Sequence, residues 1–199
     1  AEVDRTDNMN VLPSTWAFKC KRFPDGLVRK LKDRFCVRGD CQIDGIDVFD
    51  TYATVVSWTT VRLLLVLSVV LGLAMKQVDY TAAFVQAELN ESEQVFVEMP
   101  KGCKKTGKVL KLNCALYGLR QLPRTWFEHL KEKLTSNAVG FEQSPNDPCL
   151  FYTKDVICVV YVDDCLFFSP SDAAIEGTFD QMRESGLDFN IEEDVAGFL

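Results

Sequence analysis

The sequence predicts an α+β fold, in which antiparallel strands joined by tight turns combine with a small number of helices. Two apolar, β-branched and aromatic runs flank an abrupt pair of carboxylates within Val156–Ser169, as in a hairpin of buried strands. A second pair of alternating runs, Trp16–Arg22 and Val28–Val37, surrounds a Pro-Asp-Gly turn. The apolar run Ser57–Gly72 has instead the length and the end signals of a helix.

The composition is that of a globular protein. The chain has 199 residues, 47% hydrophobic and 26% charged, which suits one sizeable domain or a domain of two lobes. The longest apolar run, Leu63–Met75, is too short to span a bilayer, and the polar Ala1–Asn10 differs from a signal peptide. Eight scattered cysteines and one histidine argue against a zinc centre and indicate reduced thiols in an intracellular, non-secreted protein.

Charge is unevenly distributed along the chain. The net charge is −7, yet Lys19–Gln42 and Lys101–Lys111 are basic, and many acids follow Asp172. Basic segments can contact phosphate even in an acidic protein, although charge alone favours an ordinary solvated surface. On and beside the predicted hairpin, the cationic side chains suited to phosphate are Lys19, Lys21, Lys32, Arg34 and Arg38.

The remaining segments alternate between strands and helices. Ser57–Gly72, apolar almost all round, is expected to be a buried core helix. The helix at Thr125 should bury Trp126, Leu130 and Leu134, with His129 on its polar face and without a chemical role. The sequence further predicts strands over Ala74–Tyr80, Gln94–Met99, Val109–Leu112, Cys149–Tyr152, Val156–Tyr161 and Asp188–Leu199, and helices over Thr125–Ala138 and Ala173–Ser185.

A phosphate-binding loop is rejected. Gly102-x-x-x-x-Gly107-Lys108 resembles a P-loop, but Val109 stands where that motif needs Ser or Thr for Mg²⁺. Because no strand-to-helix context surrounds it either, the segment is interpreted as a lysine-rich turn.

The adjacent carboxylates of Asp163 and Asp164 are the first candidate site. Between buried strands they would repel each other and lose hydration, which a hard divalent cation such as Mg²⁺ would relieve. A solvated acidic turn without a role explains this stretch equally well. Asp79, near the end of another strand, is by itself more typical of a helix cap than of a metal ligand.

Four blocks in order resemble the reverse transcriptase domain of Ty1/copia-type LTR retrotransposons. They are Lys32-x-Arg34-x-x-x-Arg38-Gly39 with Gln42, Gln77-Val-Asp-Tyr-Thr-Ala-Ala-Phe84, Leu116-Tyr-Gly-Leu-Arg-Gln-x-Pro-Arg-x-Trp126 and Tyr161-Val-Asp-Asp164. The resemblance runs from about Trp16 to the last residue. It implies an RNA-directed DNA polymerase whose right-hand palm, an antiparallel sheet packed on helices, carries a β-rich fingers hairpin. Residues 1–199 would form one domain fragment, with a fingers-like hairpin and loop over about 16–56 and the palm with part of the fingers over 57–199.

The family also implies a two-metal site. Asp79, Asp163 and Asp164 would be the catalytic residues and the ligands of two Mg²⁺ ions, for which Mn²⁺ could substitute, with Asp79 and Asp163 bound directly to both. The resemblance assigns Lys32 and Arg34 to the triphosphate, Phe84 to the sugar 2′ position, Tyr117 and Gly118 to the nascent base pair, and Gln121 to the template side. Arg38, Lys19 and Lys21 are expected to contact nucleic acid as cations of the basic hairpin. For Phe84 and Tyr117 the alternative is core packing.

Three departures from the family pattern suggest drift in an element no longer under full constraint. Ala53-Thr-Val55 replaces Ala-Pro-Val, Asp40 follows Gly39 where an apolar residue is usual, and Cys103 follows Gly102 in place of Phe. The family would continue beyond Leu199 with the rest of the palm, a thumb and an RNase H domain. We therefore expect a weak grip on primer–template and poor polymerisation by this chain alone.

The implied partners are an RNA or DNA template with its primer, deoxynucleoside triphosphates, and the remainder of the Pol polyprotein (thumb, RNase H and integrase), in a cytoplasmic virus-like particle or the nucleus and without a membrane. Two alternatives stay open. One is a catalytically silent relic of a retroelement with a palm-like fold. The other is an RNA-binding module that uses the basic hairpin and leaves the acids solvated.

Overall fold

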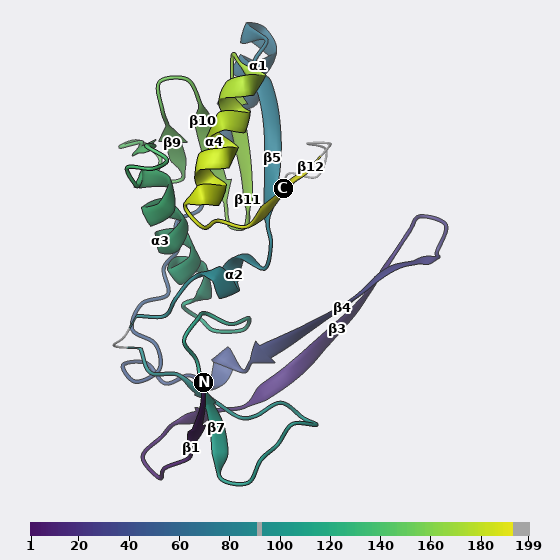
Figure 1. Ribbon diagram of the computed structural model, residues 1–199, viewed down its shortest axis with the longest axis vertical. Coiled ribbons are helices and arrows are strands. Elements are labelled where there is room, and N and C mark those ends of the chain that lie inside the picture. The colour runs from purple at the N-terminus through teal and green to yellow at the C-terminus, as the bar shows by residue number, and fades with distance from the viewer. Residues whose placement is uncertain (91–92, 193–199) are drawn as a thin grey trace. The chain divides into compact units, whose positions relative to one another are not determined.

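The computed structural model of the chain, shown in Figure 1, describes residues 1–90 and 93–192. Its contacts divide the chain into two compact units, Ala1–Tyr52 with Ala87–Thr125, and Ala53–Gln86 with Trp126–Leu199. The described residues form four α-helices and three sheets, so the expected mixture of helices and sheets is confirmed. How this division relates to the predicted fingers and palm segments stays a prediction.

A small sheet and a long hairpin make up the strands of the first unit. The sheet has the order β1-β7-β6-β2, with β1 (Glu2–Asp4), β2 (Val11–Leu12), β6 (Phe96–Val97) and β7 (Lys108–Lys111). Acidic β1 lies beside the lysine-rich turn, where Glu2 pairs with Lys105 and Asp4 with Lys108. This pairing neutralises part of the segment that resembles a P-loop in sequence.

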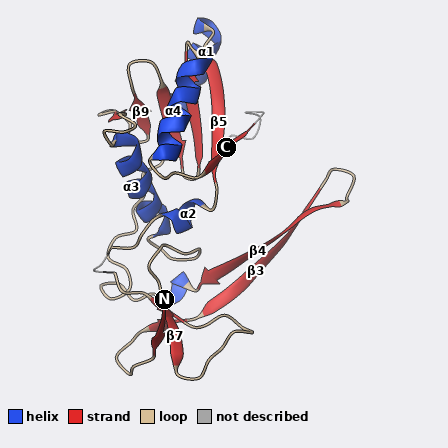
Figure 2. Ribbon diagram, in the orientation of Figure 1, coloured by secondary structure: helices blue, strands red, loops and turns tan. Residues whose placement is uncertain are grey.

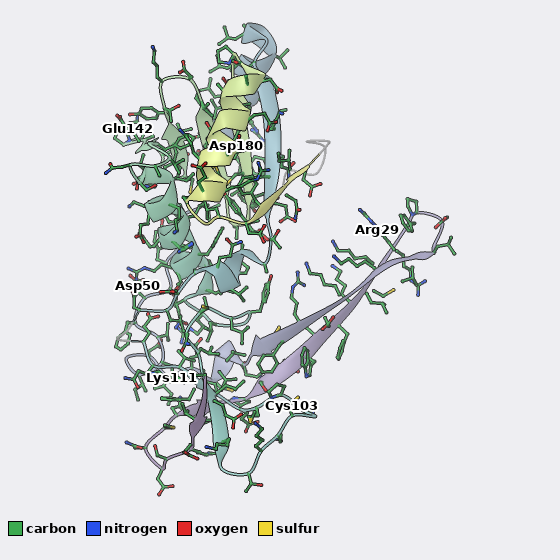
Figure 3. The ribbon with its side chains drawn as sticks, viewed as in Figure 1. Arg29, Asp50, Cys103, Lys111, Glu142 and Asp180 are labelled. Carbon is green, nitrogen blue, oxygen red and sulfur yellow. The ribbon has the colours of Figure 1, made fainter. Side chains whose placement is uncertain are left out.

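The hairpin joins β3 (Ser14–Arg22) to β4 (Val28–Val37), close to the predicted bounds. The register gives it two chemically different faces, because paired residues share a face and successive residues alternate. One face carries the cross-strand pairs Lys19↔Lys32, Lys21↔Lys30 and Ala17↔Arg34, and the other carries Trp16↔Phe35 and Cys20↔Leu31. Side chains extend from both sides of the hairpin, with Arg29 near its turn (Figure 3).

The second unit contains a six-stranded sheet of order β12-β5-β11-β10-β9-β8. Its strands are β5 (Ala74–Tyr80), β8 (Glu142–Gln143), β9 (Leu150–Tyr152), β10 (Ile157–Tyr161), β11 (Asp164–Ser169) and β12 (Phe189–Glu192). All neighbouring strands pair antiparallel. The rest of the strand predicted over Asp188–Leu199 lies outside the described residues.

Helices α3 (Leu122–Thr135) and α4 (Asp172–Glu184) bury apolar side chains against this sheet. The ring of Phe179 from α4 lies 5.0 Å from that of Phe167 on β11, and Trp126 from α3 lies 5.0 Å from Tyr80 on β5. Strand alternation puts Tyr80 and Phe167 on one face and Asp79 on the other. Asp79 and its partner Asp164 therefore lie on the face opposite to these aromatic contacts. Figure 2 shows α4 lying over the strands of this sheet.

The predicted start of α3 at Thr125 is wrong by three residues. The helix begins at Leu122, with Pro123 in its first turn, where a missing N–H removes no internal hydrogen bond. Trp126, Leu130 and Leu134 are all buried, as predicted.

Helix α1 (Trp58–Leu71) has the predicted ends but not the predicted burial. The Ser57 hydroxyl accepts from the Thr59 N–H, and Gly72 ends the helix at φ 64°. Only a narrow stripe of Val61, Leu64 and Ser68 is buried, while its remaining large apolar side chains are at least partly exposed. The prediction of a core helix is wrong because apolar composition does not determine how many faces of a helix have a packing partner. No helix in the described part of the chain is both long and apolar enough to cross a bilayer.

Candidate active site

The acidic residues of the second unit meet at one end of its sheet. Asp164, the first residue of β11, pairs directly with Asp79 of β5, and Asp163 precedes it in the turn. Residues directly opposite each other in an antiparallel pair have Cα atoms about 4.5–5.5 Å apart and side chains on the same face. The register therefore places Asp79 opposite Asp164, which is 85 positions away along the chain, and Asp163 is the neighbouring residue in the turn.

The turn between β10 and β11 has only two residues, Val162 and Asp163, because Tyr161 pairs with Asp164. Val162 adopts φ 54°, a left-handed conformation that a β-branched residue rarely takes. Two donors hold the carbonyls of this turn: the Trp126 indole N–H donates to Val162 O at 2.7 Å, and the Tyr80 N–H donates to Asp163 O at 3.3 Å. The backbone carbonyls of both turn residues are thus held by donors from α3 and β5.

Asp164 differs electrostatically from an ordinary surface acid. Burial raises its pKa, and the negative charges of Asp163, Asp79 and Glu192 raise it further. The Gln77 amide opposes this by donating to the Asp164 carboxylate at 3.2 Å. The turn is therefore not the fully solvated acidic turn that the sequence left open, although Asp163 itself is exposed.

Within residues 1–90 and 93–192, no group of three or more His, Cys, Asp or Glu side chains is arranged to hold a metal ion. Asp79 lies inside β5 and not at the start of α2 (Ala83–Gln86), so the helix-cap interpretation has no support. Asp79 and Asp163 are both exposed at this end of the sheet.

The thiols of this unit are buried on the helix-covered side of the sheet. Cys149, Cys158 and Cys165 are buried, and all eight cysteines of the chain are free, as the sequence predicts. Burial raises the pKa of Cys149 to about 12 and raises those of Cys158 and of its neighbour Tyr80. The thiols of Cys149 and Cys158 and the hydroxyl of Tyr80 are therefore neutral at physiological pH.

Phe84, which the family resemblance assigns to the sugar 2′ position, belongs to the short helix α2 in the same unit as the acids. Its ring is half-buried. The sequence did not predict α2.

The residues assigned to the triphosphate and the base pair belong to the first unit. The Arg34 guanidinium lies 5.0 Å from the centre of the Tyr117 ring, and its buried Nε finds no hydrogen-bond partner among the described residues. Lys32 lies two residues before Arg34, on the same face of β4. A buried donor of this kind, next to a lysine, suits an anionic ligand.

Gly118 brings the Tyr117 segment against the end of β4. Its φ is 93°, and a Cβ there would lie 2.1 Å from the Val37 carbonyl oxygen. A Cβ on Gly39 would in turn lie 1.9 Å from Gly118 O, so both positions require glycine. The Val37 N–H donates to Tyr117 O at 2.7 Å and closes this contact.

Gln121, expected near the template, is almost completely buried at 1% exposure. Its Oε1 accepts from Gln42 Nε2 at 2.9 Å, and both amides donate to the Asp47 carbonyl oxygen. Gln42 Oε1 also accepts from the Arg120 N–H at 2.8 Å. The two glutamines form a buried pair. The only indication of this pair in the sequence was that each glutamine belongs to one of the motifs that resemble the family.

Arg38 forms an ion pair with Asp40, the residue that stands where the family usually has an apolar side chain. Its Nε and Nη2 donate to the two carboxylate oxygens of Asp40 at 2.8 and 2.6 Å. The hydrogen bond raises the pKa of Arg38 and lowers that of Asp40. Lys19 and Lys21, by contrast, are exposed on the basic face of β3.

Residues 2–199 match the family described as reverse transcriptase (RNA-dependent DNA polymerase), and the chain belongs to this family. Within the family, its relatives are retrotransposon Pol polyproteins of the Ty1/copia type, and the chain corresponds to part of such a polyprotein. The resemblance found in the sequence is thereby confirmed.

Three relatives show the extent of the similarity. The chain is 34% identical over 78% of its length to "Retrovirus-related Pol polyprotein from transposon TNT 1-94" of Nicotiana tabacum. It is 30% identical over 89% of its length to "Retrovirus-related Pol polyprotein from transposon RE1" of Arabidopsis thaliana. It is 31% identical over 82% of its length to "Truncated transposon Ty1-A Gag-Pol polyprotein" of Saccharomyces cerevisiae. The matched segments span 12%, 12% and 13% of these relatives.

Proposed function

We propose that this chain carries the polymerase active site of an RNA-directed DNA polymerase, in which Asp79, Asp163 and Asp164 hold two Mg²⁺ ions. The observation that supports this most strongly is the direct pairing of Asp164 with Asp79, with Asp163 adjacent in the turn. Family membership supports the same reaction class.

The donor set fits a hard divalent cation. Carboxylate oxygens are the ligands that Mg²⁺ prefers, and the raised pKa of Asp164 reflects burial and a concentration of negative charge that a cation would relieve. Bound Mg²⁺ would lower the pKa of the primer 3′-hydroxyl and neutralise the triphosphate. Asp79 and Asp163 would turn toward the ions, while Gln77 and the strand pairing hold Asp164 in place.

On the nucleotide, Arg34 and Lys32 would bind the triphosphate, and Phe84 would exclude a ribose 2′-hydroxyl. The unpartnered Arg34 Nε supports the first assignment, because a phosphate oxygen would complete its hydrogen bonding. Tyr117 and Gly118 would lie beside the nascent base pair, and Gln121 would act on the template side.

Template and primer would bind through the basic face of the hairpin. Lys19 and Lys21, with Arg38, would contact backbone phosphates, since exposed cations on one face of a β-ribbon can follow a charged strand. The other partners would be deoxynucleoside triphosphates and the remainder of the Pol polyprotein, in a virus-like particle or the nucleus.

The test is single-nucleotide extension of a primed RNA template in Mg²⁺ or Mn²⁺. We expect extension by the 199-residue chain and its loss in Asp163→Asn, while the surface variant Asp180→Asn on α4 behaves like the wild type. Extension that survives Asp163→Asn would contradict the assignment. Enzyme should be in excess over primer, so that addition of a single nucleotide is detected even when primer–template binds weakly.

A second candidate, an RNA-binding module, is favoured by one observation, the concentration of Lys19, Lys21, Lys30, Lys32 and Arg34 on one face of the hairpin. It predicts RNA binding that needs no divalent metal and is unchanged by Asp163→Asn. A silent relic predicts a folded chain with neither extension nor Asp163-dependent metal binding.

A further inference from the structure

The turn that carries Asp163 is held in a conformation that its own sequence disfavours. Val162 is β-branched and adopts φ 54°, where a Cβ crowds the backbone and glycine or asparagine is usual. The side chain of Val162 is 37% exposed, so side-chain burial does not by itself explain why the turn keeps this geometry. An external contact must stabilise it.

Trp126 supplies that contact. Its indole N–H donates to the Val162 carbonyl oxygen at 2.7 Å, with the ring at 0% exposure. The ring is fixed in turn by the edge of Tyr80, 5.0 Å away at 66°, and by the His129 ring at 5.9 Å. Tyr80 directly follows Asp79, and its N–H donates to the next carbonyl of the turn, that of Asp163. One packed aromatic pair therefore touches both acidic segments of the site.

We propose that Trp126 is a positioning residue of the polymerase reaction, which anchors the Val162 carbonyl and thereby fixes where Asp163 and Asp164 leave the turn. The inference rests on the proposed function of these acids. The proposed role belongs to the indole N–H and not to the ring as a whole. Any large aromatic side chain could fill this core position, but only tryptophan offers a hydrogen-bond donor at this point.

Two tryptophan variants separate the two roles. Trp126→Phe keeps an aromatic ring next to Tyr80 and removes the donor. Trp58→Phe, at the start of α1 where the side chain is 58% exposed, is the matched control.

The first measurement uses the unmodified chain. It has three tryptophans, so a ¹H–¹⁵N spectrum should show three indole N–H signals, which the tryptophan-to-phenylalanine variants assign. The Trp126 signal should exchange with water about 100-fold or more slowly than that of Trp58, because its donor is buried and hydrogen-bonded. Equal exchange rates would show that the anchor does not exist and would overturn the proposal.

The second measurement is Mn²⁺ binding followed by electron paramagnetic resonance, together with single-nucleotide extension. Trp126→Phe should weaken the Asp163-dependent Mn²⁺ binding and lower kcat, each by about 10- to 100-fold, because small displacements of catalytic groups have effects of this size. The KM for the nucleotide should change by less than about threefold, because the variant leaves the proposed triphosphate ligands intact. Values equal to those of Trp58→Phe would overturn the proposal.

The same measurements distinguish the absence of the proposed metal site from the absence of a positioning role for Trp126. If the wild-type chain shows no Mn²⁺ binding that Asp163→Asn removes, the metal site itself is refuted, whatever Trp126 does. If that binding is present and Trp126→Phe leaves it unchanged, only the positioning role is refuted.

If Trp126→Phe does not fold, a further variant can relieve the backbone strain at Val162. Glycine accepts φ 54° without strain, so the double variant Trp126→Phe/Val162→Gly should fold and recover part of the Mn²⁺ binding. A double variant that still does not fold would assign Trp126 to core packing alone and overturn the proposal.

Discussion

The buried hydrogen bond between the side-chain amides of Gln42 and Gln121 predicts that replacing either residue lowers the stability of the fold. Leucine has nearly the shape of glutamine, but Gln121→Leu removes the acceptor of Gln42 Nε2 and one of the two donors to Asp47 O. Gln42→Leu leaves the Arg120 N–H and Gln121 Oε1 without these partners. At 1% and 7% exposure, water cannot readily replace either amide.

The size of the effect follows from the number of hydrogen bonds lost. A buried polar group left without a partner costs about 1–3 kcal/mol, so each single variant should be destabilised by this amount. Because both variants lose the same Gln42–Gln121 hydrogen bond, the double variant should cost about 1 kcal/mol less than the sum of the two.

Urea unfolding of the wild type, both single variants and the double variant measures this coupling. Gln181→Leu, at an exposed position of α4, is the control and should lie within about 0.5 kcal/mol of the wild type. Strict additivity, or a Gln121→Leu variant as stable as the control, would show that the Gln42–Gln121 hydrogen bond does not stabilise the fold. In that case Gln121 would be available for a template role without a structural one.

The remaining predictions concern three single residues. Burial raises the pKa of Asp164 in the folded state. The fold therefore loses stability as the pH rises from the usual carboxyl pKa of the unfolded chain through the raised pKa of the folded one. Asp164→Asn should raise the Tm at pH 7 and give no gain at a pH below both of these pKa values. Asp40→Asn should release Arg38 for phosphate and steepen the salt dependence of single-stranded RNA binding by about 0.7 for each additional phosphate that is neutralised, whereas Asp25→Asn in the hairpin turn should not. Phe84→Ala should raise ribonucleotide incorporation relative to deoxyribonucleotide by about 10- to 100-fold in primer extension, and an unchanged ratio would return Phe84 to core packing.

Much of the fold was predictable from local pattern. The apolar runs on either side of Asp163 and Asp164 predicted the β10–β11 hairpin, and the alternation around Pro24 predicted β3 and β4, because strand periodicity and turn residues are local signals. The short α2 was missed, since four residues carry too little periodicity to be recognised.

The burial of α1 was predicted wrongly for a different reason. Its end signals, Ser57 and Gly72, are local and were correct. Burial depends on which other elements pack against a helix, and its sequence does not contain that information. Thus Val66 and Val70, as apolar as buried Val61, are exposed.

In the candidate site, too, the residue types could be predicted from the sequence but their contacts could not. The three acids could be nominated from residue type and from the family blocks, but their proximity depends on the register of β5 with β11, which pairs residues far apart in sequence. The Trp126 indole contact with Val162 and the Gln42–Gln121 pair could not be predicted from the sequence. Both are tertiary hydrogen bonds of side chains that sequence patterns treat as core or as surface.

Mn²⁺ binding to the wild type, Asp79→Asn and Asp163→Asn, followed by electron paramagnetic resonance, tests whether Asp79 and Asp163 hold the same metal ion. It requires neither a primer nor the rest of a polyprotein. If the acids at the end of β5 and in the β10–β11 turn form one metal site, each substitution should weaken the same binding event by about tenfold or more, while Asp180→Asn leaves it unchanged. Equal binding by all four proteins would show that these acids do not form a metal site.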